Sequence, residues 1–220
     1  MPRSFTEREK EIVRARLLQR ARSCFAAYGI RKTSLDDLVK AAGISKGAFY
    51  LFFNSKEELF FEVVQEFEED YQNSLLKEAA ARPERPSGTQ VARFLNRAFS
   101  LWKTHPLFAH FGPDEYQYLI RKLPEDKVAL LLNRDQVFVD RLLSQWKKQG
   151  IRFKCDAKTF ASLMRALFYV SLHSADLELG GSSPVQDLLI KLIVDGLVVH
   201  PQKEKLLKRR SERGGQKSYE

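Results

Sequence analysis

The first part of the chain alternates helical hydrophobic spacing with turn-forming residues, a pattern that predicts short helices. Apolar side chains in residues 35–42 recur three, four and seven positions apart, which places them on one face of a helix. Gly43 is a common residue at a helix C-terminus, and Ser45 is a good N-cap for a helix over residues 46–53. The pattern predicts two short helices joined by a glycine turn.

A longer helix precedes this pair. Apolar residues line one face of residues 17–28, and Gly29 closes the pattern. A three-helix unit is therefore complete near Asn54. Directly after it, Ser55 and Glu58 have the spacing of a capping box for a further helix.

The remainder of the chain predicts helices alone, so the fold class is all-α. No alternating strand pattern or tandem repeat of useful length occurs. We expect an N-terminal three-helix domain at 1–54, a larger helical domain at 55–200 that starts with a connector helix at 55–81, and a basic, disordered tail at 201–220. Within the larger domain, hydrophobic spacing and loop residues predict further helices near 91–104, 113–123, 125–149, 157–172 and 185–197.

Charge separates the first unit from the connector helix. The net charge of the chain is +9, and residues 1–56 hold twelve Lys and Arg against five Asp and Glu, a surplus of seven positive charges. Residues 57–81 reverse this balance, with eight acids against Lys77 alone. The basic charge of the first unit favours an anionic partner such as DNA. The acidic helix that follows would repel DNA, which leaves the basic face as the one that docks.

The composition narrows the class of protein further. With 220 residues, 44% of them hydrophobic, the chain can bury a core. No apolar run approaches the length of a membrane span, and the two cysteines, Cys24 and Cys155, lie far apart. We expect a cytoplasmic protein that does not interact with membranes and whose thiols are reduced.

Signatures of enzymes and metalloproteins do not appear. The four histidines are scattered and match no metal-ligand spacing. There is no nucleophile elbow, phosphate-cradling glycine loop or dinucleotide fingerprint. The sequence therefore predicts no catalytic residue, no metal site and no cofactor.

Four segments together match a known pattern. They are Ala-Arg-Ser-Cys-Phe-Ala-Ala-Tyr-Gly at 21–29, Thr-Ser-Leu at 33–35 followed by Ala-Ala-Gly-Ile-Ser-Lys-Gly-Ala-Phe-Tyr at 41–50, and Phe-Asn-Ser-Lys-Glu-Glu-Leu at 53–59. Over roughly the first quarter of the chain, without gaps, this resembles the helix-turn-helix DNA-binding domain of the TetR family of transcriptional regulators. Without that resemblance, a helical hairpin with solvated Lys and Tyr side chains would explain the glycine turn equally well.

The resemblance implies which residues meet double-stranded DNA. Phosphate contacts are implied at Thr33, Ser45, Tyr50 and Lys56, and the helix start nearest the bases at Lys46, Gly47 and Ala48. Many relatives have Thr at the position of Ala48, so one hydroxyl contact is missing here. Many have a polar residue at the position of Leu51, which either contacts a thymine methyl group or packs without contacting DNA.

The resemblance also implies that the larger domain binds a small-molecule effector and pairs with a second copy of the chain. The last helix is apolar over a wide face, more than one neighbouring helix requires. The predicted dimer interface is Phe168, Leu172, Leu188, Leu189, Leu192, Ile193 and Gly196. The predicted effector pocket, chosen for aromatic density, is Phe94, Trp102, Phe108, Phe111, Tyr116, Phe138, Phe168 and Tyr169.

These inferences lead to a homodimeric repressor that binds a palindromic operator and is released by an apolar or aromatic effector. The sequence leaves three alternatives open. The same fold could act as an activator, it could sense oxidation through a thiol, or the hairpin could belong to a helical interaction or lipid-binding protein that does not bind DNA.

Overall fold

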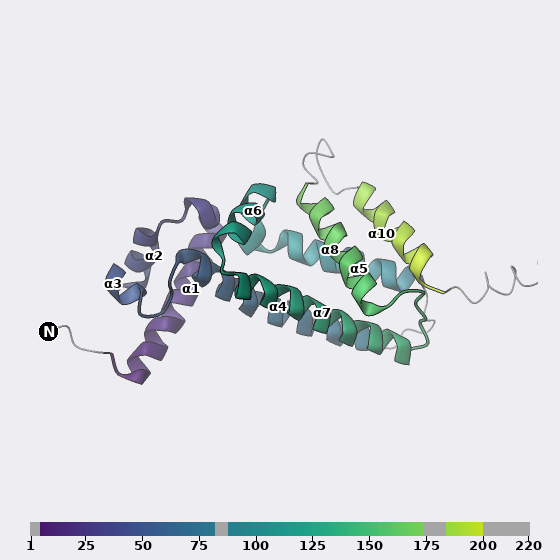
Figure 1. The fold of residues 1–220 in the computed structure, drawn as a ribbon, viewed down its shortest axis with the longest axis horizontal. Helices are drawn as coiled ribbons and strands as arrows, with labels where there is room; N and C mark the ends of the chain where they lie inside the picture. Colours follow the sequence, from purple (N-terminus) through teal and green to yellow (C-terminus); the bar gives the residue numbers. More distant parts are fainter. Residues whose placement is uncertain (1–4, 82–87, 174–183, 200–220) are drawn as a thin grey trace, which may run out of the picture. The chain divides into compact units, whose positions relative to one another are not determined.

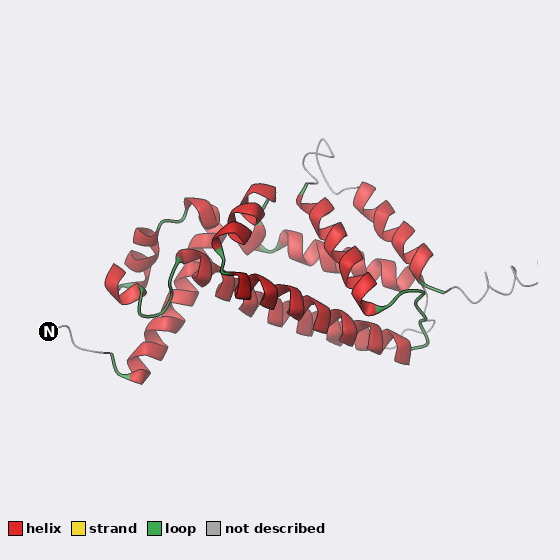
Figure 2. Cartoon of the chain, in the orientation of Figure 1, coloured by secondary structure: helices red, strands yellow, loops and turns green. Residues whose placement is uncertain are grey.

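The computed structural model describes residues 5–81, 88–173 and 184–199, and in these ranges the chain is helical (Figures 1 and 2). Extended pairing in these ranges is limited to one bridge, between Phe153 and Val198. The all-α prediction is confirmed, while the tail predicted at 201–220 lies outside the described residues. The helices are α1 Glu7–Lys32, α2 Leu35–Ala42, α3 Lys46–Phe49, α4 Lys56–Ala80, α5 Gly88–Thr104, η1 Pro106–Phe108, α6 Pro113–Lys122, α7 Glu125–Lys148, α8 Ala157–Leu172 and α10 Pro184–Leu197.

Local sequence signals set the limits of the N-terminal helices. Ser34 caps α2 and forms a capping box with Asp37. Gly43 ends α2 in the left-handed conformation, with φ +68°. Gly29 has φ +76° and ψ 168°, which breaks the helical conformation inside α1 although hydrogen bonding resumes as far as Lys32.

Helix α3 is shorter than the predicted 46–53. The α-helical segment ends at Phe49, and the amides of Leu51 and Phe52 then donate to carbonyls three residues back. The chain turns there and still buries Phe49 and Phe53 on the inner side. The tighter turns hold the residues after α3 against the preceding helix without continuing it.

The helices pack as two compact units. The first comprises residues up to Leu75 together with Phe99–Arg134, and the second comprises Leu76–Ala98 together with the residues from Asp135 onward. These packing units divide the chain elsewhere than the functional boundary predicted after residue 54. The reason is that η1 and α6 share a hydrophobic core with the N-terminal helices.

The core of the first unit is rich in aromatic side chains. Phe25 of α1 lies edge-on to Phe60 of α4, with the ring centroids 5.0 Å apart. Phe108 of η1 and Leu119 of α6 are buried in the same core. The helix-turn-helix region is therefore continuous in packing with η1 and α6.

The second unit is organised around Trp146 of α7. This side chain is fully buried, and Phe94 of α5 and Phe160 of α8 pack edge-on to it at 5.0 and 6.4 Å. Helices α8 and α10 lie side by side in this unit (Figure 1). Within the described part of the chain, no helix is both long enough and apolar enough to cross a membrane.

Candidate nucleic-acid interface

The start of α3 and the turn after it present an exposed surface. Ser45 accepts a hydrogen bond from the amide of Ala48 at 3.1 Å, so it caps the helix and fixes where α3 begins. Beyond it, Tyr50 and Leu51 are 57% and 67% exposed. Gly47 is also exposed, and its missing side chain leaves the backbone accessible for close approach.

Lys46, at the first position of α3, forms an ion pair with Asp36 of α2. Its ammonium nitrogen lies 2.8 Å from a carboxylate oxygen of Asp36, and both side chains are largely exposed. The hydrogen bond and charge of Asp36 raise the pKa of Lys46. Lys46 therefore has an acidic partner within the helix-turn-helix that any phosphate must replace.

The hydroxyl of Thr33, where the resemblance implies a phosphate contact, has a partner within the protein. The residue is 1% exposed, and its hydroxyl donates to the carbonyl of Gly29 at 2.8 Å. The hydroxyl thus satisfies a carbonyl at the end of α1. Sequence alone could not show this, because Thr33 also lies beside the capping residue of α2.

Lys56 is similarly occupied at the start of α4. Its ammonium group donates to the carbonyls of Ile30, Thr33 and Arg31, at 2.9, 2.8 and 3.3 Å. Burial lowers the pKa of Lys56, and the nearby charge of Glu57 acts in the opposite direction. The lysine charge thus stabilises the carbonyl end of α1, so a phosphate contact at Lys56 would be additional to this role.

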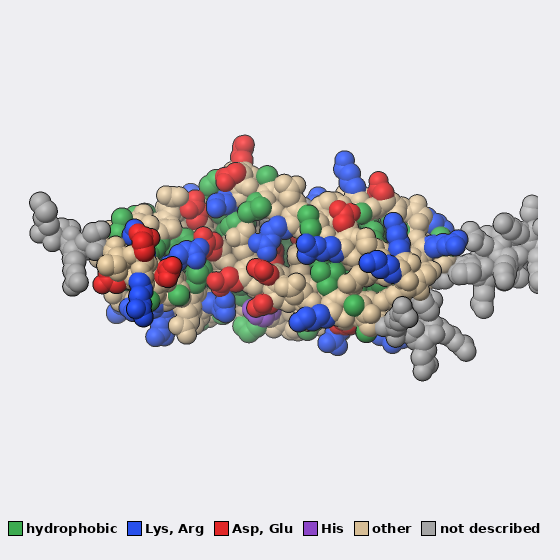
Figure 3. All heavy atoms as spheres, turned by 90° about the horizontal axis from the view of Figure 1, so that it is seen from below, with side chains coloured by type: hydrophobic (Ala, Val, Ile, Leu, Met, Phe, Trp, Pro, Cys, Tyr) green, Lys and Arg blue, Asp and Glu red, His purple; other side chains and the backbone are tan. Residues whose placement is uncertain are grey.

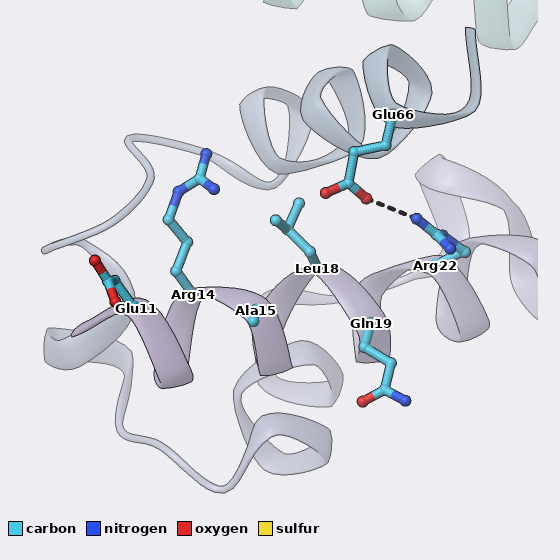
Figure 4. Close-up of a pocket in the computed structure, with 7 residues that line it drawn as sticks. All are labelled: Glu11, Arg14, Ala15, Leu18, Gln19, Arg22 and Glu66. Carbon is cyan, nitrogen blue, oxygen red and sulfur yellow. Dashed lines mark hydrogen bonds and ion pairs between the residues drawn. The ribbon is translucent and has the colours of Figure 1, made fainter. Parts of the chain in front are cut away.

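Ion pairs connect α1 to α4. Arg14 is paired with Glu62, and Arg22 with Glu66 at 2.6 Å. Between them lies a shallow groove of about 380 Å³, into which Leu18 points (Figure 4). These ion pairs offset the negative charges of Glu62 and Glu66, two of the acids that the sequence places in the connector helix. On the face of the molecule drawn in Figure 3, basic and acidic side chains are interspersed.

The aromatic residues predicted as an effector pocket fall into separate groups. In the first unit, the Trp102 ring stacks on Phe108 at 4.5 Å and meets Phe111 edge-on at 6.1 Å. The ring of Tyr116 lies 6.4 Å from that of Phe111. Four predicted residues thus form one connected cluster around the end of α5, η1 and α6.

The other predicted pocket residues belong to the second unit. Phe94 is buried against Trp146 and fills the core there. Phe138 is half-buried, and the Phe168 ring lies 6.2 Å from that of Tyr169, which is exposed. A pocket role for these residues stays a prediction.

Helix α10 has an inner and an outer apolar face. Ile190 and Val194 are buried, whereas Leu188 and Leu192 are 55% and 58% exposed. The structure places the remaining predicted interface residues as follows: Leu189, Ile193 and Phe168 are half-buried, Gly196 is exposed and Leu172 is buried. Leu172 therefore packs inside the unit, and the outer face comprises Leu188, Leu192 and their neighbours.

The surroundings of the two cysteines bear on the thiol-sensor alternative. Both are half-buried and unpaired with each other. Burial raises the pKa of Cys24 and of Cys155, with nearby Asp37 and Asp156 adding to the effect. A raised thiol pKa means less thiolate, the reactive form, so the structure disfavours the thiol-sensor alternative. The described residues also contain no group of three or more His, Cys, Asp or Glu arranged to hold a metal ion.

Two acids of this region have contacts that the sequence pattern does not indicate. The local pattern shows Asp36 only as an acid in the first turn of α2, whereas the structure pairs it with Lys46. Glu57 was counted among the connector acids, although it is buried and bonded to Tyr118 of α6. No local pattern signals either contact, because the partners lie 10 and 61 positions away.

The segment from the middle of α1 to the start of α4 matches known regulators. Residues 17–63 match the family described as bacterial regulatory proteins, tetR family. An uncharacterised HTH-type transcriptional regulator of Bacillus subtilis, YhgD, is 27% identical over 165 residues, which are 69% of this chain and 78% of that protein. The HTH-type transcriptional repressor Rv1474c of Mycobacterium tuberculosis is 42% identical over 53 residues, 24% of this chain and 28% of that protein.

The chain thus spans little more than a quarter of the length of that repressor but most of the length of YhgD. The fold extends further: a TetR-family regulator from Pectobacterium atrosepticum aligns with a TM-score of 0.65 and 22% identity, covering 90% of this chain and all of that one. The matched segment contains the capped α2–α3 turn and its exposed Lys46, Tyr50 and Leu51. Residues 17–63 therefore match the TetR family of DNA-binding transcriptional regulators, and the fold of the chain resembles that of a solved member of this family.

Proposed function

We propose that this protein is a homodimeric repressor that binds a palindromic operator and is released by a small effector. The observation that supports this most directly is the exposure of Tyr50 and Leu51 on the turn after α3, together with the exposed Lys46 at the start of that helix. A recognition helix needs a cation or hydroxyl for phosphates and a side chain free to reach base edges. The proposed interface is Ser45, Lys46, Gly47, Ala48, Tyr50 and Leu51, with Lys56 at its border.

The proposed dimer rests on the outer face of α10. Leu188 and Leu192 lie one helical turn apart, with Val185 a further turn toward the N-terminus, and all three are exposed. A row of exposed large aliphatic side chains is typical of a protein interface. A second copy joined there would give a two-fold molecule, as a palindromic operator requires.

The proposed effector site involves the aromatic cluster of the first unit. Trp102, Phe111 and Tyr116 are partly exposed, and the ring of Phe111 packs against those of both Trp102 and Tyr116. Such a cluster suits an apolar or aromatic molecule. Repression agrees with two similar proteins: Rv1474c is named a repressor, and SmeT of Stenotrophomonas maltophilia, 18% identical with a TM-score of 0.56, is described as the repressor of a multidrug efflux pump.

An effector releases DNA only if it binds the DNA-incompetent conformation more tightly than the competent one. The test is footprinting of the full chain on DNA flanking its own gene, with and without apolar aromatic compounds. We expect one protected palindrome, and a compound that removes the protection. Absence of any protected sequence would reject the proposed function, and protection that raises transcription of the adjacent gene would make the protein an activator.

A further inference from the structure

A carboxylate is buried where α6 meets the start of α4. Glu57 lies in the first turn of α4 and is 8% exposed. Its side chain accepts a hydrogen bond from the hydroxyl of Tyr118 on α6. Acidic side chains are almost never buried to this extent without a partner, because the charge loses its hydration. The pair therefore has a structural purpose that a surface acid of the connector helix would not have.

The hydroxyl of Tyr118 remains protonated and can therefore donate a hydrogen bond to Glu57. Burial, together with the hydrogen bond to Glu57, raises the pKa of Tyr118 to about 12. The phenol accordingly keeps its proton at any ordinary pH and donates to the carboxylate. The N-terminal end of α4 adds a favourable field for the negative charge of Glu57.

The residue before Glu57 ties the same turn of α4 to the helix-turn-helix. Lys56 donates to the carbonyls of Ile30 and Thr33, in the link between α1 and α2. Two consecutive residues thus make opposite attachments: Lys56 holds the α1–α2 junction, and Glu57 holds α6. Both attachments lie in the first compact unit. In the same unit, the rings of Phe60 and Phe111 stack with their centroids 6.0 Å apart.

We infer that Tyr118 is a positioning residue for operator binding, which acts through Glu57 to fix the helix-turn-helix on α6 and so sets the half-site spacing that the dimer accepts. This inference rests on the proposed dimeric operator binding. Two recognition helices must meet major grooves about 34–36 Å apart, so a loose attachment in each copy broadens the range of spacings that fit. Non-specific binding, which depends on charge, does not require that register.

The experiment compares the wild-type chain with Tyr118→Phe, which removes one oxygen and keeps the ring. Affinity is measured for the operator found by footprinting, for the same operator with one base pair inserted or removed at its centre, and for an unrelated duplex. We expect the altered spacing to weaken the wild type by about tenfold or more. In Tyr118→Phe this penalty shrinks several-fold, while the affinity for the unrelated duplex stays unchanged.

Two further variants separate positioning from folding. Glu57→Gln keeps an acceptor for the Tyr118 hydroxyl and should retain most of the spacing penalty, whereas Glu57→Ala should lose it as Tyr118→Phe does. Tyr28→Phe, an equal change at an exposed tyrosine of α1, is the matched control and should behave as the wild type. Thermal unfolding of every variant shows that the protein measured is folded.

The inference is overturned if folded Tyr118→Phe keeps the spacing penalty of the wild type, even if its melting temperature is lower. If Tyr118→Phe does not fold, the same result in Glu57→Ala overturns it. A wild type that binds its operator without regard to spacing also overturns it. A wild type that protects no DNA rejects the proposed function itself, a result recognisably different from the other two.

Discussion

Replacing Leu51 with Ala tests whether this side chain contributes to base recognition. Leu51 is 67% exposed on the turn directly after α3, so the structure favours the contacting alternative over the packed one. The thymine methyl group is the apolar feature of the major-groove edge, and a leucine side chain is suited to contact it. Our hypothesis is that Leu51 recognises an A·T pair in each half-site.

The exposed fraction limits the size of the effect. Complete burial of a leucine side chain contributes about 1.5–3 kcal/mol, so covering the exposed two thirds contributes at most about 1–2 kcal/mol. One methyl group covers only part of that surface. We therefore expect about 1 kcal/mol in each half-site, a roughly fivefold change in affinity.

The assay exploits the single-methyl difference between thymine and uracil. Fluorescence anisotropy titrations compare the operator with versions in which one thymine per half-site is replaced by uracil. One such position should weaken the wild type, and Leu51→Ala should be insensitive there while binding the unmodified operator more weakly. Leu101→Ala, at a partly exposed leucine of α5, should leave the uracil effect unaltered. If no thymine position distinguishes wild type from Leu51→Ala, Leu51 does not recognise A·T.

Three further changes test other parts of the structure. Asp36→Asn removes the ion pair of Lys46 and should tighten binding to unrelated DNA by about twofold to fivefold at low salt. Filter-binding titrations measure this affinity, and an equal gain at high salt would contradict an electrostatic cause. Gly29→Ala should lower the free energy of unfolding by about 1–3 kcal/mol in urea denaturation, because φ +76° with ψ 168° is a glycine conformation; unchanged stability would mean that the bend relaxes. Leu188→Glu with Leu192→Glu should convert dimer to monomer in light scattering, whereas an intact dimer would exclude the outer face of α10.

Most of the fold was predictable because its signals are local. The Ser45 cap and the Gly43 stop each depend on residues within four positions, and the structure confirms both. The extent of α3 was not predictable in this way. Phe49 and Phe53 are one helical turn apart, which suggested a continuous helix, but the chain buries both rings through a tighter turn.

The sequence predicted correctly those residues of the candidate site whose side chains are exposed to solvent. Tyr50 and Leu51 follow from the motif, and they are exposed. Thr33 and Glu57 differ from expectation because their partners, Gly29 and Tyr118, are selected by the packing of whole helices. Similarly, periodicity identified α10 as broadly apolar, but only the neighbouring helix determines which stripe is covered.

The formal charge of the N-terminal region overstates the number of contacts that it can make with phosphates. The surplus of seven positive charges in residues 1–56 acts at long range and steers DNA toward the protein. Arg14 and Arg22, however, are paired with acids of α4, and Lys56 with backbone carbonyls. The salt dependence of affinity reports the phosphates actually neutralised. Attraction and contact are therefore separate properties here: the net charge of the unit determines the first, and the ion pairs that hold α1 on α4 limit the second.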